Sequence, residues 1–271
     1  MTVLEMVSQW PVELAAAGYI DSAGQTKATE LSSHVFELAS VTKPLFAYVV
    51  LVAVEEGTLS LDQPAGPPGA TVRHLLAHSS GMADDPVVKL AGVEKRRIYS
   101  STGFDELGLV LAAASGLDPA TYFHEALVEP LGLTSTALVG SPAYGARSSV
   151  DDLLVVLREW LNPTLISPQT LDEATSAQFP HLDGVLPGYG RQQPNIWGLG
   201  FELRGHKSPH WTGSNNSQHT FGHFGRSGTF IWVDPDHQAG CVALTNREFG
   251  SWAVPLWPKF SDQVLAEIQG L

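Results

Sequence analysis

The sequence predicts an α+β fold in which an antiparallel sheet, flanked by N- and C-terminal helices, is built from both ends of the chain. Strand-like patterns occur near the start and again near the end of the chain, at residues 18–20, 35–38, 197–203, 229–234 and 240–245. The patterns between these two groups are helical. We therefore expect a single domain of residues 1–271, in which a sheet lobe (about 1–60 and 195–271) carries an inserted helical lobe (about 61–194).

The N-terminal segment contains two helical patterns. Residues 2–17 place apolar side chains at helical spacing, and Gly18 follows as a stop signal. The second pattern runs from Leu45 to Glu56 and is ended by Gly57. We therefore expect one helix before the first strand and one helix after the second strand.

The middle of the chain has the pattern of a helical region. Five segments show helical spacing, at residues 71–77, 105–114, 119–128, 150–160 and 168–178. Asp105, Asp118 and Ser149 occupy positions where a side chain could cap the first turn of a helix. Residues 179–195 are rich in Pro and Gly and predict a loop, and the tail at 254–271 predicts a last helix that begins after Pro258.

Composition and charge exclude several classes of function. The 15 Lys and Arg against 28 Asp and Glu give a formal net charge of −13 at pH 7, and no basic run interrupts this acidic chain. Such a protein repels phosphate backbones, so nucleic-acid binding is not expected. The single cysteine, Cys241, allows no internal disulfide and is interpreted as a small buried residue of a strand.

The start of the chain carries no pattern of a signal peptide, because no Lys or Arg precedes Lys27 and charged residues and Pro11 interrupt the apolar stretch. The longest uncharged apolar run, from Pro44 to Val54, is shorter than the roughly 20 residues that span a bilayer. We therefore expect a cytoplasmic protein with no membrane partner. No motif indicates an oligomeric state.

Several motif-like groups do not favour a metal or nucleotide site. His74 and His78 have i, i+4 spacing, but Leu75 stands where a zinc-protease helix needs its Glu, so packing or capping is the better interpretation. The histidines of the C-terminal third match no metal template; they are His206, His210, His219 and His223. Gly198 and Gly200 begin a GxG string that Leu203 breaks. No metal ion and no cofactor is expected.

The most informative segment is Ser40-Val41-Thr42-Lys43. A Ser and a Lys three residues apart at the start of a helix lie about 60° apart around the axis and roughly 4.5 Å apart along it, so both side chains can enter one cleft. A lysine whose pKa is lowered from about 10.4 can take the proton of a serine hydroxyl and make it a nucleophile. The backbone N–H groups of a helix N-terminus suit a developing oxyanion.

Two further pieces follow in the chain. Tyr99 stands with Ser100 and Ser101 just before a predicted helix, and a tyrosine can exchange protons with a serine or with a leaving group. His223 and Phe224 precede Gly225, which would let a substrate carbonyl approach the backbone closely. Tyr99 as a core aromatic residue, and His223 as a hydrogen-bonded residue of a strand edge, are the structural alternatives.

These three motifs, in this order, resemble those of the serine β-lactamase and penicillin-binding protein superfamily. Within it the chain is most similar to the branch of class C β-lactamases, D-alanyl-D-alanine peptidases and β-lactamase-like esterases, so a β-lactamase/transpeptidase-like fold is expected. The resemblance extends over most of the chain, through LASVTKPLFA around Ser40, TVRHLLAHSSGM at 71–82, the Asp151-Asp152-Leu153 helix start after residues 146–148, and FGHFGRSGTFIWVDP at 221–235.

The resemblance implies an acyl-enzyme mechanism. Ser40 would attack a carbonyl carbon, while Lys43 and Tyr99 share the work of general base and general acid. The backbone N–H groups of Ser40 and Arg226 would bind the oxyanion, next to Gly225. His223 would take the place that Lys holds in many family members and would orient the substrate or assist proton transfer. This cationic cluster would form a local positive site that favours a neutral or locally anionic substrate group.

One substitution bears on the substrate. The second motif of the family usually ends in Asn, whereas this chain has Ser101, whose shorter hydroxyl cannot span the same gap to the substrate. With the missing export signal, this favours a serine hydrolase acting on a small-molecule ester or amide. A true β-lactamase or D-alanyl-D-alanine peptidase, with a β-lactam or peptide substrate, is the first alternative. A ligand-binding protein that is acylated without turnover is the second.

Overall fold

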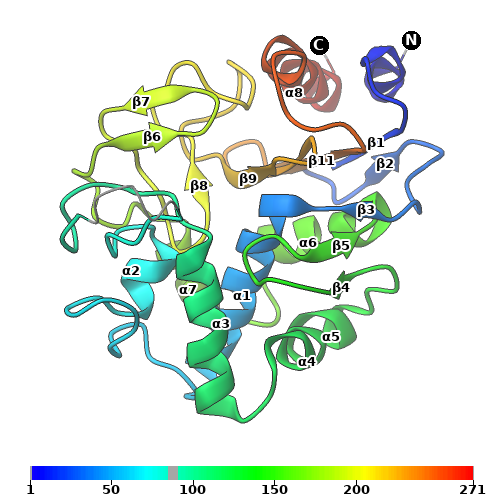
Figure 1. The fold of residues 1–271 in the computed structure, drawn as a ribbon. Coiled ribbons are helices and arrows are strands. Elements are labelled where there is room, and N and C mark those ends of the chain that lie inside the picture. The colour runs from blue at the N-terminus through cyan, green and yellow to red at the C-terminus, as the bar shows by residue number, and fades with distance from the viewer. Residues whose placement is uncertain (1, 85–90, 271) are drawn as a thin grey trace.

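The computed structural model describes residues 2–84 and 91–270, and its centre is a six-stranded antiparallel sheet (Figure 1). The strand order is β2-β1-β11-β10-β9-β8. The strands are β1 (Ala15–Ile20), β2 (Thr26–Ala28), β8 (Glu202–Leu203), β9 (Phe221–Gly225), β10 (Thr229–Asp234) and β11 (Ala239–Thr245). The sheet therefore joins both ends of the chain, and the predicted α+β class is confirmed.

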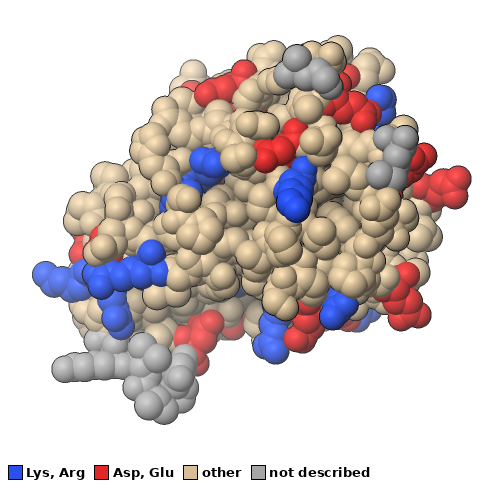
Figure 2. Space-filling model, turned by 90° about the horizontal axis from the view of Figure 1, so that it is seen from above, with Lys and Arg blue, Asp and Glu red and all other residues tan. Residues whose placement is uncertain are grey.

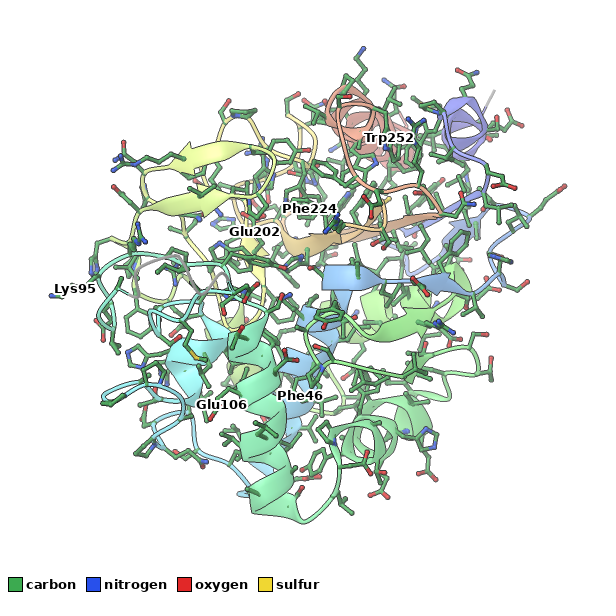
Figure 3. The ribbon with its side chains drawn as sticks, viewed as in Figure 1. Phe46, Lys95, Glu106, Glu202, Phe224 and Trp252 are labelled. Carbon is green, nitrogen blue, oxygen red and sulfur yellow. The ribbon has the colours of Figure 1, made fainter. Side chains whose placement is uncertain are left out.

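Helices cover both faces of this sheet, and successive residues of a strand face opposite layers. In β11, Cys241 and Ala243 face the helix α8 (Ala253–Gln269) and the 3-10 helix η1 (Val3–Gln9). Val242 and Leu244 face the other layer, which contains α1 (Thr42–Glu55) and α6 (Val150–Leu161). Figure 3 shows Phe46 of α1 on one side of the sheet and Trp252, just before α8, on the other. Cys241 is buried and free, as expected.

The N-terminal prediction is wrong beyond residue 9. The apolar residues Val3, Leu4 and Val7 form a 3-10 helix rather than a long α-helix, and they pack against α8. Trp10 precedes Pro11 and is extended, as the residue before a proline prefers to be. The following alanines belong to β1, because pairing with β11 overrides their helical preference.

The helical middle of the chain is observed, with element bounds that differ from the predicted ones. These are α2 (Val72–Leu76), α3 (Thr102–Ser115), α4 (Pro119–Phe123), the π-helix η3 (His124–Val128), α5 (Glu129–Leu131) and α7 (Pro168–Ala174). Asp118 caps α4 and Ser149 caps α6, as predicted. Asp105 is not a cap: α3 begins three residues earlier, with Ser101 at the N-cap position. None of the helices in the described ranges is long and apolar enough to cross a bilayer.

Short strands outside the main sheet shape its surroundings. The predicted strand at 35–38 is β3 (Phe36–Glu37), which pairs with β5 (Ala146–Ser148) and so belongs to a three-stranded sheet with β4 (Ala137–Leu138). Strand β9 was not predicted, and only residues 202–203 of the predicted strand 197–203 belong to a named strand, β8.

Two C-terminal expectations are also corrected. The expected loop at 179–195 contains a hairpin of β6 (Gly184–Leu186) and β7 (Gly190–Gln192). Helix α8 begins at Ala253 rather than after Pro258, which lies within the helix. Trp257 and Phe260 are fully buried, so packing against the sheet holds the helix despite the proline.

Candidate active site

Ser40 lies between the small sheet and the main sheet, in the one-turn 3-10 helix η2 (Ala39–Val41) that leads into α1. The preceding residue, Ala39, has φ +45°, a left-handed conformation that is costly for a residue with a Cβ and is typical of functional sites. Ser40 is partly exposed and lines a cleft of about 540 Å³ together with Ser101, Arg226 and the β4–β5 turn. The cleft has the size of a small-molecule site.

Lys43 lies one turn further along the chain, and its side chain is fully buried. Its Nζ donates to Ser40 Oγ at 3.4 Å, to Ser101 Oγ at 3.3 Å and to the Ala143 carbonyl oxygen at 2.9 Å. Burial lowers the pKa of Lys43 to about 7, although the carboxylates of Asp84 and Asp105 oppose that shift. A substantial fraction of the amine is therefore neutral near pH 7 and can accept a proton from Ser40.

The carbonyl that holds Lys43 is fixed by residues that the sequence did not point to. The Ala143 amide donates to Ser141 Oγ at 3.0 Å, and the Ser141 hydroxyl donates in turn to Asp105 of α3. Asp105 was expected to be a helix cap, and it instead anchors the β4–β5 turn beside the cleft. Because Lys43, Asp105 and the β4–β5 turn are far apart in sequence, no local pattern could have indicated that they meet.

Tyr99 lies beside the same amine, with its ring centroid 4.7 Å from Lys43 Nζ. Burial raises the pKa of the Tyr99 phenol, and the nearby Ser40 hydroxyl partly offsets that rise. The Tyr99 hydroxyl is buried and makes no hydrogen bond to another described residue. It is therefore protonated at neutral pH, with a proton available for transfer.

An aromatic cage surrounds the Tyr99 ring. The ring centroids of His78, His223 and Trp197 lie 4.8, 5.7 and 5.7 Å from that of Tyr99. His78 accepts a hydrogen bond at Nδ1 from the Ser100 amide at 3.2 Å. His78 was interpreted as a packing or capping residue, and in the structure it packs against Tyr99.

His223 lies in β9, and its side chain is buried. Its Nδ1 donates to the Phe224 carbonyl oxygen at 2.6 Å, so Nε2 carries a lone pair, and Nε2 has no partner among the described residues. Burial and the neighbouring Lys43 lower the pKa of His223 to about 3. The imidazole is neutral, so the strongly positive cluster expected from the sequence does not form at these residues.

The end of β9 lies directly against η2. A Cβ on Gly225 would lie 2.3 Å from the Leu38 carbonyl oxygen and 3.2 Å from the Ser40 amide nitrogen, so only glycine fits at this position. The amides of Ser40 and Arg226 flank it, and neither donates to a protein acceptor in the described ranges. Two free amide donors beside a serine hydroxyl can stabilise a developing oxyanion.

A buried charge network lies behind the aromatic cage. Lys207 Nζ lies 5.9 Å from the Trp197 ring centroid, pairs with Glu202 and donates to the Leu203 carbonyl oxygen at 2.7 Å. The other carboxylate oxygen of Glu202, labelled in Figure 3, accepts hydrogen bonds of 2.8 Å each from His210 and Trp211. Burial alone would raise the pKa of Glu202, but His210 and Lys207 lower it to about 2.

Two other histidines have structural partners. His74 forms the capping box of α2 with Thr71, which agrees with the capping interpretation. His219 pairs with Asp236 at the surface. Within residues 2–84 and 91–270, no group of three or more His, Cys, Asp or Glu side chains is arranged to hold a metal ion.

Comparison with known proteins places this geometry in a family. The beta-lactamase family model matches residues 1–265. A solved structure described as a beta-lactamase from Mycobacterium bovis is 54% identical, with a TM-score of 0.94 over 98% of this chain and 99% of the other. Simvastatin synthase from Aspergillus terreus, at 18% identity, shares the fold with a TM-score of 0.78 over 99% of this chain and 94% of the other.

A curated relative is more distant. Penicillin-binding protein 4* of Bacillus subtilis is 28% identical over 217 residues, which are 64% of this chain and 47% of that protein. The chain thus spans about half the length of this relative. Because the family model covers nearly the whole sequence and the sheet and helices superpose on those of the solved structures, the chain belongs to the beta-lactamase family, within the serine β-lactamase and penicillin-binding protein superfamily.

Proposed function

We propose that the protein is a serine hydrolase that cleaves a small ester or amide through an acyl-Ser40 intermediate. The observation that carries the proposal is the environment of Lys43. Its buried amine lies 3.4 Å from Ser40 Oγ, and its pKa is lowered to about 7. A neutral amine in contact with a serine hydroxyl is the arrangement that activates the serine as a nucleophile.

In the proposed reaction, Ser40 Oγ attacks the substrate carbonyl carbon while its proton passes to Lys43, with Tyr99 sharing the transfer. The amides of Ser40 and Arg226 stabilise the oxyanion of the tetrahedral intermediate. The bond to the leaving group then breaks, and Tyr99 and Lys43 return the proton to the departing oxygen or nitrogen. Water attacks the acyl-Ser40 ester in a second, equivalent cycle that releases the acid and restores the serine.

His223 has an orienting role in this proposal. Because its proton is on Nδ1 and donated to Phe224, its Nε2 can only accept a hydrogen bond. The acceptor position beside Tyr99 suits either the phenol or a donor group of the substrate. A neutral imidazole at this place orients its partner without adding charge to the cleft.

A true β-lactamase or D-alanyl-D-alanine peptidase is the second candidate. It is supported by the name of the 54% identical relative, which is described as a beta-lactamase. Ser101 counts against it, because its hydroxyl is already engaged with Lys43 Nζ at 3.3 Å and offers no amide to a substrate. The two candidate functions share the same nucleophile and differ in whether a β-lactam or an ester is the substrate that is hydrolysed rapidly.

Replacing Ser40 by Ala tests the nucleophile. Wild type and Ser40→Ala are incubated with short-chain nitrophenyl esters and with a chromogenic cephalosporin, and both turnover and intact mass are measured. We expect ester turnover in the wild type, a transient increase in mass equal to the acyl group, and the loss of both in the variant, because the variant lacks the hydroxyl that would be acylated.

The other outcomes separate the alternatives. Rapid, Ser40-dependent cephalosporin turnover that exceeds ester turnover supports the second candidate. A stable Ser40 adduct without turnover indicates a ligand-binding protein that is acylated only once. Equal turnover by wild type and Ser40→Ala would contradict the assignment of Ser40.

Gly225→Ala tests the proposed oxyanion site. The new methyl group meets the Leu38 carbonyl oxygen and pushes η2 away from β9. We expect kcat/KM for ester hydrolysis to fall by about 10²-fold or more, since small displacements of reacting groups have effects of that size. Gly250→Ala is the matched control, because a Cβ there lies 3.9 Å from the nearest atom outside its immediate chain neighbours. Near-wild-type turnover by Gly225→Ala would show that the close approach of β9 to η2 at this position is not needed for activity.

A further inference from the structure

We propose that the leaving-group side of the site is a separate subsite that binds an anionic group, a carboxylate or a phosphate, attached to an apolar body. This inference rests on the proposed function and extends it by naming a substrate class. It concerns a second cavity of about 630 Å³ that is lined by Tyr99 but not by Ser40.

The second cavity is formed where the hairpin β6–β7 meets the segment that leads to Tyr99. The Arg97 amide donates to the Asp183 carbonyl oxygen at 2.7 Å, and Arg97 forms a parallel bridge with Gly184. Tyr189 at the hairpin turn packs against Phe224 of β9, at a ring-centroid distance of 5.9 Å. These contacts hold the hairpin beside the reaction centre, so the cavity is part of the fold.

The charge in this cavity is opposite to that of the protein. Lys95, Arg96 and Arg191 line it and are exposed, whereas among the described residues its one carboxylate is that of Asp183. Arg191 pairs with Asp183 at 3.2 Å, and neither Lys95 nor Arg96 has a carboxylate partner within the part of the chain that the structure describes. Figure 2 shows Lys and Arg side chains gathered at the left edge of the face, the side on which Figure 3 labels Lys95.

A buried cation adds to this positive field. Arg97 is 3% exposed, and within the described ranges its guanidinium donates only to backbone carbonyls, among them those of Asn195 at 3.0 Å and Gln178 at 2.7 Å. Burial lowers the pKa of Arg97 to about 10, so the group stays charged at neutral pH. Carbonyl oxygens satisfy its hydrogen bonds without cancelling its charge, and the field extends into the cavity above.

The cleft that contains Ser40 differs in this respect. Its two cations are each paired with a carboxylate: Arg147 with Glu37 at 2.9 Å, and Arg226 with Glu248 at 3.5 Å. An anionic group therefore gains more from the second cavity than from the first. Since the chain carries a net charge of −13, the basic cavity does not follow from overall composition.

Tyr99 assigns the second cavity to the leaving group. In the proposed reaction the phenol protonates the departing atom, so that atom must lie on the Tyr99 side of the serine, with the acyl group in the other cleft. The apolar part of the lining consists of Ile98, Val185 and Pro187. A leaving group with an aromatic or alkyl body and an anionic end matches both parts of the lining.

The test compares 4-acetoxybenzoate with its methyl ester, which differ by one negative charge on the leaving group. The ratio of their kcat/KM values cancels effects common to both substrates. We expect this ratio to fall by about 5-fold to 20-fold in Lys95→Gln/Arg96→Gln, the range for losing two exposed charge contacts. The ratio should also fall with added salt in the wild type. Lys259→Gln, which removes an exposed charge from α8, is the matched control and should leave the ratio unchanged.

A binding measurement separates this inference from the proposed function. Calorimetry with Ser40→Ala compares 4-hydroxybenzoate with methyl 4-hydroxybenzoate, and we expect the anion to bind more tightly, with the preference lost when Lys95 and Arg96 are also replaced by Gln. If no ester is turned over but this preference is found, the subsite stands and the hydrolase proposal fails. An unchanged kcat/KM ratio in the double variant, or equal affinity for the two phenols, overturns the subsite.

Discussion

Replacing Lys43 by Met is expected to lower kcat/KM for ester hydrolysis by at least about 10³-fold, because the variant keeps the apolar stem but loses the proton acceptor of Ser40. In the wild type, kcat/KM should rise with pH through about 7, the pKa to which burial lowers Lys43, as the amine loses its proton. Steady-state kinetics on wild type and Lys43→Met measure both effects. A range of about pH 5.5 to 9 extends far enough below and above this pKa to cover the whole transition.

The same variant has an opposite effect on stability. Lys43 has a folded-state pKa of about 7 against an ordinary value of 10.5, so between these pH values the unfolded chain holds a proton that the folded protein does not. The contribution of Lys43 therefore destabilises the fold fully below pH 7 and fades as the pH rises toward 10.5.

Urea unfolding at several pH values checks this linkage. Lys43→Met should be more stable than the wild type at pH 6, and the difference should shrink as the pH rises. Lys259→Met is the matched control, because Lys259 is exposed on α8 and should change neither turnover nor stability appreciably. A Lys43→Met enzyme with wild-type turnover would rule out the general-base role.

Replacing Glu202 by Gln is expected to lower the free energy of unfolding by about 3–5 kcal/mol. The carboxylate lies at the centre of a buried network, with Lys207, His210 and Trp211 all donating to it. Gln keeps the shape but leaves the buried Lys207 ammonium without a counter-charge. Urea unfolding followed by tryptophan fluorescence gives the change directly.

A second substitution distinguishes a lost charge pair from lost packing. Lys207→Met alone leaves the Glu202 carboxylate buried with only the hydrogen bonds from His210 and Trp211, and should also destabilise. In Glu202→Gln/Lys207→Met neither charge remains, so the double variant should lose clearly less than the sum of the two single losses. Additive losses would show that the pair contributes only through packing.

The architecture was predictable wherever a local pattern and the tertiary contacts agree. Strand β10 was predicted with its observed bounds, because Thr229 to Asp234 is a β-branched and aromatic run between turn residues. Strand β9 was missed because it contains Gly222 and Gly225, which are poor strand formers. Both glycines are required by neighbours: a Cβ on Gly222 would lie 2.1 Å from the Ile231 carbonyl oxygen, and one on Gly225 would meet Leu38. Requirements of this kind are set by distant segments and leave no local periodicity.

The candidate site also contains some features that a local sequence pattern predicts and others that distant segments determine. Ser40 and Lys43 are neighbours on one turn, so their proximity followed from helix geometry. The groups that set the properties of Lys43 come from other elements: Ala143 from the β4–β5 turn, and Asp105 from α3. The pKa of a buried amine depends on how completely these elements exclude water, and a sequence pattern does not report that quantity.

Strands β1 and β11 are neighbours in the sheet, with Ala15 opposite Thr245, although they come from opposite ends of the sequence. During synthesis on the ribosome, β1 must wait for almost the entire chain before its main partner exists. The helical middle can fold earlier through local contacts. The pairing of β1 with β11 forms late, because it carries the entropic cost of closing the long loop between these two strands. Slow folding, and a period in which β1 exposes unpaired backbone groups to other chains, are the expected result of this topology.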